Sequence, residues 1–510
     1  MTDSRTAKSI RNSYTALFYN IITILLGFFS RKIFIDALGV EVLGLNTTAG
    51  NLLGFLNLAE LGIGGAVAFT LYSPLAKDDR ETINEIVAVQ GWLYRRIAYF
   101  VLAGSAVLFC CFPIIFDKME LPLWYAYTSF GVLLFSSILG YFVNYRQIIL
   151  SASQQQYKIN NSVQGIKITK TVIQILGLSL LPLGYIFWLV VEFIAAMVTA
   201  WSLNRTVKRS YPWLKNNISN GRELLKKHSI VVEKIKQIFF HKIGGFALSQ
   251  TSPIIIYAYI SLSMVAIYGN YMLILSGLWL LNGALNDGIG AGVGNLVAEG
   301  NRERIMLFFR EFTASRYCFA TILSLCLLLL TTPFMSIWFG EEYLLDNTTF
   351  YIIIGYAFVS LTRTNDAFIG AYGLFGDIWS PVIEAAINIG LSILLGYYFG
   401  LAGIVAGVLA SLVLVIACWK PYYLFTRGFR LSIWHYIRIF GKNIALVAIS
   451  GVICLALFSY TYKAPDNIVQ WFVEAVKALT LCSVVCVTVF QLLSRDFRLF
   501  TKRVKAIVKL

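Results

Sequence analysis

Fourteen long apolar segments fill this chain of 510 residues, and they constrain its fold more than any motif does. Each has about 20 residues or more, which lets a helix cross a hydrocarbon layer of roughly 30 Å. In lipid a helix satisfies its own backbone hydrogen bonds, whereas a membrane barrel would show short alternating strands. We therefore predict an all-α polytopic membrane protein with about fourteen transmembrane helices. The predicted spans are 13–37, 43–71, 87–115, 123–149, 161–182, 184–205, 237–262, 266–297, 305–332, 348–374, 378–398, 401–423, 440–461 and 470–493.

The placement of Lys and Arg between these segments predicts the orientation of the chain. Of 42 such residues, all but six lie at the N-terminus, in or beside alternate loops, or in the C-terminal tail. Cytoplasmic loops are enriched in Lys and Arg, so both termini and every even-numbered loop are expected in the cytoplasm. The six exceptions are Arg31, Lys32, Lys118, Arg363, Lys463 and Lys477.

Composition argues against several classes of function. The net charge of +16 does not indicate nucleic-acid binding, because the basic residues mark membrane ends, where each attracts anionic headgroups by roughly 1 kcal/mol. No cleavable signal peptide is expected, since the N-terminus runs into a full-length span. All eight cysteines fall inside predicted spans and are interpreted as packing residues, so we expect no disulfide, metal site or other cofactor.

The sequence also contains an internal repeat. The motif Gly-Ile-Gly occurs at 62–64 and again at 288–290. After each copy comes the pattern Ala-x-x-Asp/Asn-Arg-Glu-x-Ile, at 76–83 and at 298–305. Six predicted spans separate the copies, and this even number gives both halves the same orientation in the membrane.

Two halves with parallel repeats and a cleft between them are typical of a transporter, with the substrate site near the midplane. Asn46 and Asn270 occupy matching places before the two glycine motifs, which fits this division. We expect an N-terminal six-helix lobe at 1–205, a basic cytoplasmic linker at 206–236, a C-terminal six-helix lobe at 237–425, two further helices at 426–494 and a basic cytoplasmic tail at 495–510.

Polar side chains within the spans indicate which faces line the cleft, because a charge at the bilayer centre costs about 2.5 kcal/mol or more. The candidate substrate-binding residues are Arg31, Asn46, Asn57, Lys167, Lys170 and Arg363. Four of them are cations, which favours an anionic substrate. A diphosphate suits them, since Arg binds phosphate in bidentate geometry and Lys acts as a point charge.

Each of these cations has a structural alternative. Arg31 could extend to the outer interface, and Lys167 and Lys170 could reach cytoplasmic headgroups through their long stems. Arg363 could form an ion pair with Asp366, one helical turn away.

Four stretches resemble one known family. They are LGVEVLGLN at 38–46, AELGIG at 59–64, YSPLA at 72–76 and QQQY at 154–157. On these residues and the fourteen-span plan, the chain resembles the bacterial polysaccharide flippases, the O-antigen and capsule repeat-unit transporters of the multidrug/oligosaccharidyl-lipid/polysaccharide exporter superfamily. The N-terminal motifs carry the resemblance, and the C-terminal half matches by its plan of helices.

The resemblance implies a flippase that moves undecaprenyl-diphosphate-linked oligosaccharide repeat units from the inner to the outer leaflet of the bacterial cytoplasmic membrane by alternating access. It also implies coupling to H⁺ or Na⁺, for which Glu60, Asp287 and Asp366 are the candidate carboxylates. Glu60 could instead kink or cap its helix, and Asp287 could serve a broken helix end. Expected partners are the lipid-linked glycan, membrane lipids and polysaccharide assembly proteins, and the expected state is a monomer.

Three other functions stay open. Lipid II flippases carry Arg followed by Asp in the first span, where this chain has Arg31 followed by Lys32. Multidrug exporters usually have a deep carboxylate in the first or seventh span, whereas Asp36 lies at the outer end of the first and the seventh has none. A membrane polysaccharide polymerase or ligase would need a large outer loop. The longest outer loops are short (116–122, 333–347 and 462–469), so we do not expect an enzyme.

Overall fold

The computed structural model describes the backbone at residues 5–181, 183–215, 220–374, 376–377 and 379–508. Within its helices, the side chains at 5–7, 9–10, 240–241, 248–249, 281, 284–291 and 507–508 lie outside the described part. Helices make up most of the described chain, and no strand occurs in that part. The prediction of an all-α polytopic fold is confirmed.

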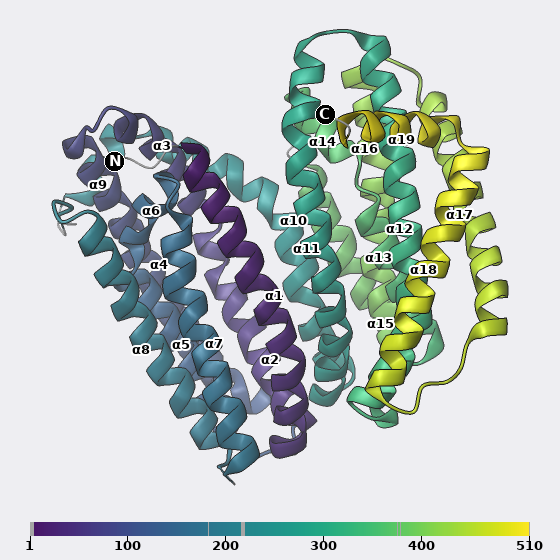
Figure 1. Ribbon diagram of the computed structural model, residues 1–510. Coiled ribbons are helices and arrows are strands. Elements are labelled where there is room, and N and C mark those ends of the chain that lie inside the picture. Colours follow the sequence, from purple (N-terminus) through teal and green to yellow (C-terminus); the bar gives the residue numbers. More distant parts are fainter. Residues whose placement is uncertain (1–4, 182, 216–219, 375, 378, 509–510) are drawn as a thin grey trace. The chain divides into compact units, whose positions relative to one another are not determined.

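Contacts between residues divide the chain into two compact units, unit 1 at Met1–Leu273 and unit 2 at Ile274–Leu510 (Figure 1). Unit 1 contains α1 (Arg5–Leu38), α2 (Val40–Leu56), the 3₁₀ turn η1 (Asn57–Glu60), α3 (Ile63–Ala76), α4 (Arg80–Ile115), α5 (Trp124–Phe142), the 3₁₀ turn η2 (Tyr145–Gln147), α6 (Ile148–Ala152), α7 (Gln156–Leu180), α8 (Tyr185–Ser210), α9 (Gly221–Lys227), α10 (Ile230–Tyr259) and the first part of α11 (Leu262–Ala298). Unit 2 contains the rest of α11, α12 (Arg302–Trp338), the 3₁₀ turn η3 (Glu341–Tyr343), α13 (Asn347–Leu361), α14 (Asn365–Ala371), α15 (Ser380–Leu412), the π-helical turns η4 (Val413–Trp419) and η5 (Leu424–Phe429) on either side of α16 (Lys420–Tyr423), α17 (Ile433–Thr461), α18 (Ile468–Leu493) and α19 (Arg495–Val508).

The predicted spans fall on helices. Nine helical segments of the described chain are long and apolar enough to cross a membrane. One of them, Ser380–Phe429, contains two predicted spans that meet at Gly400, where the backbone leaves helical geometry. The spans predicted in α1, α7, α10 and α13 are helical but do not belong to these nine, so the number fourteen stays a prediction.

The repeated sequence motif starts the same kind of long helix in each unit. The side-chain oxygen of Asp79 accepts a hydrogen bond from the backbone N–H of Thr82 at 3.1 Å, and that of Asn301 accepts one from Arg304, also at 3.1 Å. These bonds satisfy N–H groups that the first turns of α4 and α12 would otherwise leave without a helical partner. The isoleucine that closes each copy of the motif is buried. The repeat therefore encodes a capped helix start.

The first glycine motif interrupts the predicted second span. α2 ends at Leu56, the turn η1 follows, and α3 begins at Ile63. Gly62 has a φ of 96°, in the left-handed region that glycine enters without the clash of a Cβ. A Cβ there would also lie 3.0 Å from the backbone oxygen of Ile235 in α10. The second glycine motif, 288–290, lies in α11, where the side chains are outside the described part.

The boundary between the two units lies within α11, after the linker predicted at 206–236. α10 packs against α2 and α3, so the predicted seventh span belongs to unit 1 by its contacts. The lobes at 1–205 and 237–425 were predicted from the internal repeat and not from contacts, so they stay predictions.

In unit 2 the tail helix α19 lies across the end of the long helices (Figure 1). Arg503 pairs with the buried Glu311 of α12 at 2.8 Å, and Asp496 pairs with Arg310 at 2.9 Å. Beneath α19, the apolar core shared by α12, α17 and α18 contains the fully buried Cys482. The described part of the basic tail, α19, is thus packed against unit 2.

Candidate functional site

Arg31 is anchored within unit 1 by the start of α11. Its Nε donates to Oδ1 of Asn270 at 2.7 Å, and its Nη2 donates to the backbone oxygen of Ala266 at 3.2 Å. Gly269 makes room for the guanidinium, because a Cβ there would lie 2.7 Å from Nη2. Asn270 is fully buried. These bonds fix the cation on α11 instead of letting it extend to the outer interface.

Asn46 ties three helices of unit 1 together. Its Oδ1 accepts a hydrogen bond from the Ser129 hydroxyl of α5 at 2.5 Å and from the Tyr185 hydroxyl of α8 at 2.6 Å. Both lone-pair directions of this oxygen are therefore occupied, and only the amide N–H groups are left to meet another partner.

The interruption of the second span brings Asn57 and Glu60 to tyrosine hydroxyls. Asn57 Oδ1 accepts from Tyr141 at 2.8 Å and from Ser137 at 3.1 Å. Glu60 Oε1 accepts from the buried Tyr94 at 2.7 Å. The Tyr94 and Tyr141 rings are in edge contact, with centroids 5.5 Å apart. Glu60 lies in η1, at the break between α2 and α3, where the sequence had offered a helix kink as one of its roles. Its carboxylate also accepts a hydrogen bond from an uncharged hydroxyl, that of Tyr94.

The two lysines of α7 differ in their surroundings. Lys170 Nζ lies 2.7 Å from Glu192 Oε1 of α8, and Gln174 donates to the same oxygen at 3.0 Å. Lys167, one turn earlier, is exposed and has no ion pair or hydrogen bond to its ammonium in the part of the chain that the structure describes. Lys167 is therefore the member of this pair without a direct ion pair among the described residues, and Glu192 acts on it only at longer range.

In unit 2, Arg363 and Asp366 belong to a larger charge cluster. Arg363 lies where the predicted tenth span breaks between α13 and α14, and its Nε is 3.4 Å from Asp366 Oδ2. Lys420 of α16 lies 2.6 Å from the other oxygen of Asp366. Both cations also act electrostatically on Glu384 of α15. Glu384 is 5% exposed, and its Oε1 has no hydrogen-bond partner in the described chain.

Sequence reasoning did not select Lys420 or the buried Arg316. Lys420 lies near the end of a predicted span, where a basic residue is expected anyway, and its partner Asp366 is 54 residues away. Arg316 of α12 hydrogen-bonds the Asn282 side chain and is 3% exposed. Arg316 could have been selected from the sequence, because it lies well inside the span predicted at 305–332. The side chain of the candidate Asp287 lies outside the described residues.

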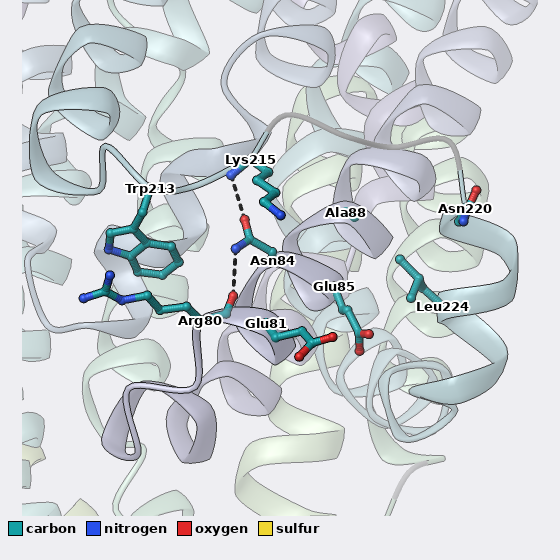
Figure 2. A pocket seen from close by; sticks show the side chains of 9 residues that line it. All are labelled: Arg80, Glu81, Asn84, Glu85, Ala88, Trp213, Lys215, Asn220 and Leu224. Carbon is teal, nitrogen blue, oxygen red and sulfur yellow. Dashed lines mark hydrogen bonds between the residues drawn. The ribbon is translucent and has the colours of Figure 1, made fainter.

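A described cavity of unit 1 lies elsewhere, at the start of α4 (Figure 2). It has a volume of about 550 Å³. Asn84 holds its wall together: its Oδ1 accepts from the backbone N–H of Lys215 at 2.7 Å, and its Nδ2 donates to the Arg80 backbone oxygen at 2.7 Å. The Arg80 guanidinium lies 5.2 Å from the centre of the Trp213 ring. None of the predicted site residues whose side chains the structure describes lines this cavity.

The α9 side of the same cavity is fastened by charge. Glu85 of α4 pairs with Lys227 at 2.7 Å and with His228 at 2.8 Å. The hydrogen bond from Lys227 to the Glu85 carboxylate raises the pKa of that lysine. Among the described residues, no group of three or more His, Cys, Asp or Glu side chains has the arrangement of a metal site.

The structure resembles three solved transporters. The lipid II flippase MurJ, in an inward closed conformation, has a TM-score of 0.65 at 16% identity over 95% of this chain and 99% of that one. An inward-facing multidrug resistance MATE family transporter of the MOP superfamily has a TM-score of 0.55 at 14% identity, over 82% and 95%. The MATE transporter VcmN of Vibrio cholerae has a TM-score of 0.51 at 12% identity, over 83% and 97%. This chain has the fold of these exporters.

No protein-family model matches the sequence, and no curated protein matches it. At identities of 12–16%, the similarity to these structures establishes the fold alone. The substrate has to be inferred from the side chains of this chain. The fold similarity and the nine described segments that are able to cross a membrane agree with the polytopic membrane protein predicted from the sequence.

Proposed function

We propose that this chain is a flippase for undecaprenyl-diphosphate-linked oligosaccharide repeat units in the bacterial cytoplasmic membrane. The observation that carries the proposal is Lys167, an exposed ammonium inside the predicted span of α7 with no ion-pair partner among the described residues. Lys170, one turn on, is neutralised by Glu192. An unpaired cation within a span is costly unless it meets water or an anion, and a diphosphate headgroup supplies that anion.

Two further cations support an anionic substrate. Arg31 uses Nε and Nη2 on α11, and a guanidinium has five N–H donors, so it keeps others for a phosphate oxygen. Arg363 lies 3.4 Å from Asp366, and its Nε makes no hydrogen bond within the described part of the chain. Substrate phosphate could therefore compete with this carboxylate. Asn46 and Asn57 serve mainly to hold helices together and offer only their amide N–H groups.

The proposed mechanism is alternating access. The sugar and diphosphate enter the cleft from the cytoplasmic side while the polyprenyl tail stays in lipid, and the chain then opens to the outer leaflet. Both termini lie in the cytoplasm, and the chain works as a monomer without a cofactor. Coupling to H⁺ or Na⁺ would use Glu60, Asp287 or Asp366. Of these, Glu60 is the better proton site in the described part, because Asp366 already has two cationic partners.

A second candidate is export of lipid II or of multidrug substrates. It is favoured by the fold match to the lipid II flippase MurJ over 95% of this chain, and by the matches to MATE transporters. Lipid II also carries a diphosphate, so Lys167 and Arg31 would serve it equally well. Cationic drugs would be repelled by the unpaired charge of Lys167.

The test is translocation of fluorescent carrier lipids in proteoliposomes. Wild type is compared with Lys167→Gln and with Lys463→Gln, which removes an exposed lysine of the loop between α17 and α18. We expect oligosaccharide-diphosphate transport in wild type and in Lys463→Gln, and at least about a tenfold lower rate in Lys167→Gln. Transport of lipid II alone, or efflux of a small cation alone, would replace the proposal with the second candidate.

A further inference from the structure

A second cavity, of about 330 Å³, lies at the end of α8 that the charge pattern predicts to be cytoplasmic. Its lining comes from one face of the helix, because the residues recur at positions i, i+3, i+4, i+7 and i+8. They are Trp201, Asn204, Arg205, Lys208 and Arg209. None of these residues has a part in the proposed transport site.

The lining carries three positive charges and no carboxylate. Arg205, Lys208 and Arg209 are exposed, and none forms an ion pair with an acid in the part of the chain that the structure describes. Lys227 of α9, by contrast, is paired with Glu85. The cavity therefore concentrates positive charge that only an external anion can neutralise.

A buried arginine orients the polar wall of the cavity. Arg146 of η2 is 8% exposed and donates a hydrogen bond to Oδ1 of Asn204. With its oxygen engaged from behind, Asn204 has its N–H groups left as donors for an acceptor in the cavity. The Nε of Arg146 has no hydrogen-bond partner among the residues that the structure describes. A fourth, fixed positive charge thus stands behind the three exposed ones.

The surroundings fit a ligand with acyl chains. Trp201 is 60% exposed, and the Arg205 guanidinium lies 5.1 Å from the centre of its ring. Tryptophan is enriched at the level of lipid headgroups. In the turns before Trp201, the apolar Ile194, Met197 and Val198 are exposed. An apolar strip thus leads along α8 to the cationic cavity, which matches a phosphate headgroup continued by hydrocarbon.

We propose that this cavity binds the phosphate of an anionic phospholipid, such as phosphatidylglycerol, from the leaflet of the predicted cytoplasmic side. Arg205, Lys208 and Arg209 neutralise the phosphate, Asn204 donates to one of its oxygens, and the acyl chains lie on the apolar strip. Basic pockets on the cytoplasmic side of membrane proteins are known to bind anionic headgroups. The site is independent of the transport substrate, so it can hold or fail separately from the proposed function.

The test is native mass spectrometry of the full chain in detergent, titrated with phosphatidylglycerol and, separately, with zwitterionic phosphatidylcholine. The site variant combines Arg205→Gln, Lys208→Gln and Arg209→Gln. The matched control combines Arg498→Gln, Lys502→Gln and Lys505→Gln, which removes three exposed charges from α19. We expect phosphatidylglycerol binding to weaken at least about tenfold in the site variant and less than about twofold in the control.

Asn204→Asp is a second variant that leaves the helix intact, because Arg146 can pair with the new carboxylate. It neutralises the buried cation and should weaken phosphatidylglycerol binding in the same direction. Equal loss in the site variant and the control would overturn the proposal. So would displacement of the lipid by equimolar glycerol phosphate, which would make this a free-anion site. Preferential binding of undecaprenyl diphosphate there would also overturn it, in favour of a carrier-lipid site.

Discussion

The guanidinium of Arg31 and the side-chain amide of Asn270 are hydrogen-bonded at 2.7 Å across 239 residues of sequence. Asn270 and Asn46 occupy matching places in the repeat predicted from the sequence, and their side-chain oxygens accept different partners. The oxygen of Asn46 receives two hydroxyls, whereas that of Asn270 receives a cation. Asn46 thus links α2 to α5 and α8 through uncharged hydroxyl groups, whereas Asn270 fixes the position of the Arg31 guanidinium.

The Arg31–Asn270 bond predicts a measurable loss of stability. Asn270→Ala removes the acceptor of a charge-assisted hydrogen bond at a fully buried position, which should lower the free energy of unfolding by about 1–3 kcal/mol. A double-mutant cycle with Arg31→Met in detergent-solubilised protein isolates the pair. A coupling energy near zero would mean that the bond does not anchor Arg31.

Gly269 provides a test of the same anchor by sterics. Gly269→Ala places a Cβ 2.7 Å from Arg31 Nη2 and should displace the guanidinium, with a lower thermal midpoint and slower transport. Gly50→Ala is the matched control, because the nearest atom to its Cβ is a Leu133 methyl at 4.0 Å. Helix propensity favours Ala in both places, so Gly50→Ala should be neutral or stabilising. Identical behaviour of the two variants would argue against the steric account.

The repeated helix cap predicts a pH dependence in one unit only. The hydrogen bonds that Thr82 donates hold the pKa of Asp79 below its usual value of 3.8. Because the folded-state pKa is lowered, the cap stabilises the fold above the unfolded value and is lost as the pH falls through the folded one. Asn301 makes the same cap with a side chain that does not titrate. Asp79→Asn should therefore keep the cap and remove the acid sensitivity of α4.

Hydrogen exchange of the Thr82 and Arg304 amides measures this difference. In wild type, protection at Thr82 should fall below about pH 4 while protection at Arg304 persists. Asn301→Ala should cost about 0.5–2 kcal/mol at any pH. Equal acid sensitivity of the two amides would show that the carboxylate is not the source of the effect.

The helices and their order could be predicted from the sequence, because the length of each apolar segment and the charges beside it can be read without knowing the tertiary contacts. The break at η1 was present in the sequence only as the alternative that Glu60 kinks its helix, within a span otherwise predicted to be continuous. In the structure, Gly62 adopts there a backbone conformation that favours glycine. The motif shared by 76–83 and 298–305 was recognised as a repeat, but its physical role as a helix cap required the hydrogen bonds to Thr82 and Arg304.

Partner choice among the charged residues could not be predicted. Lys170 and Glu192 were both visible as charges inside spans, but their pairing depends on how α7 and α8 are rotated against each other. The sequence offered Asp366 one possible partner, Arg363, as an alternative to substrate contact, and the structure adds a second, Lys420, which is 54 residues away. Ion pairs of this kind determine which cations remain available to a substrate. The sequence therefore identified Lys167 and Lys170 as candidates, but it did not show that only Lys170 forms a direct ion pair.

The Lys170–Glu192 pair predicts an asymmetry between single and double substitution. Glu192→Met leaves a half-buried ammonium without its counterion and should destabilise unit 1 by about 1–3 kcal/mol. Lys170→Met with Glu192→Met removes both charges and should recover most of that loss, because two apolar side chains of similar volume fit a membrane span. Thermal midpoints of the two variants measure it. A double variant as unstable as the single one would mean that the pair does more than neutralise charge.

The cluster in unit 2 predicts that its two carboxylates respond differently to neutralisation. Asp366→Asn removes the partner of both Arg363 and Lys420 and should lower the free energy of unfolding by about 1–3 kcal/mol. Glu384→Gln replaces a buried carboxylate with an amide of the same shape at a site where Oε1 already lacks a hydrogen bond, so it should change stability by less than about 1 kcal/mol. Chemical unfolding of both variants at neutral pH decides the point. If Glu384→Gln proved the more damaging, Glu384 rather than Asp366 would be the anion that holds Arg363 and Lys420 in place.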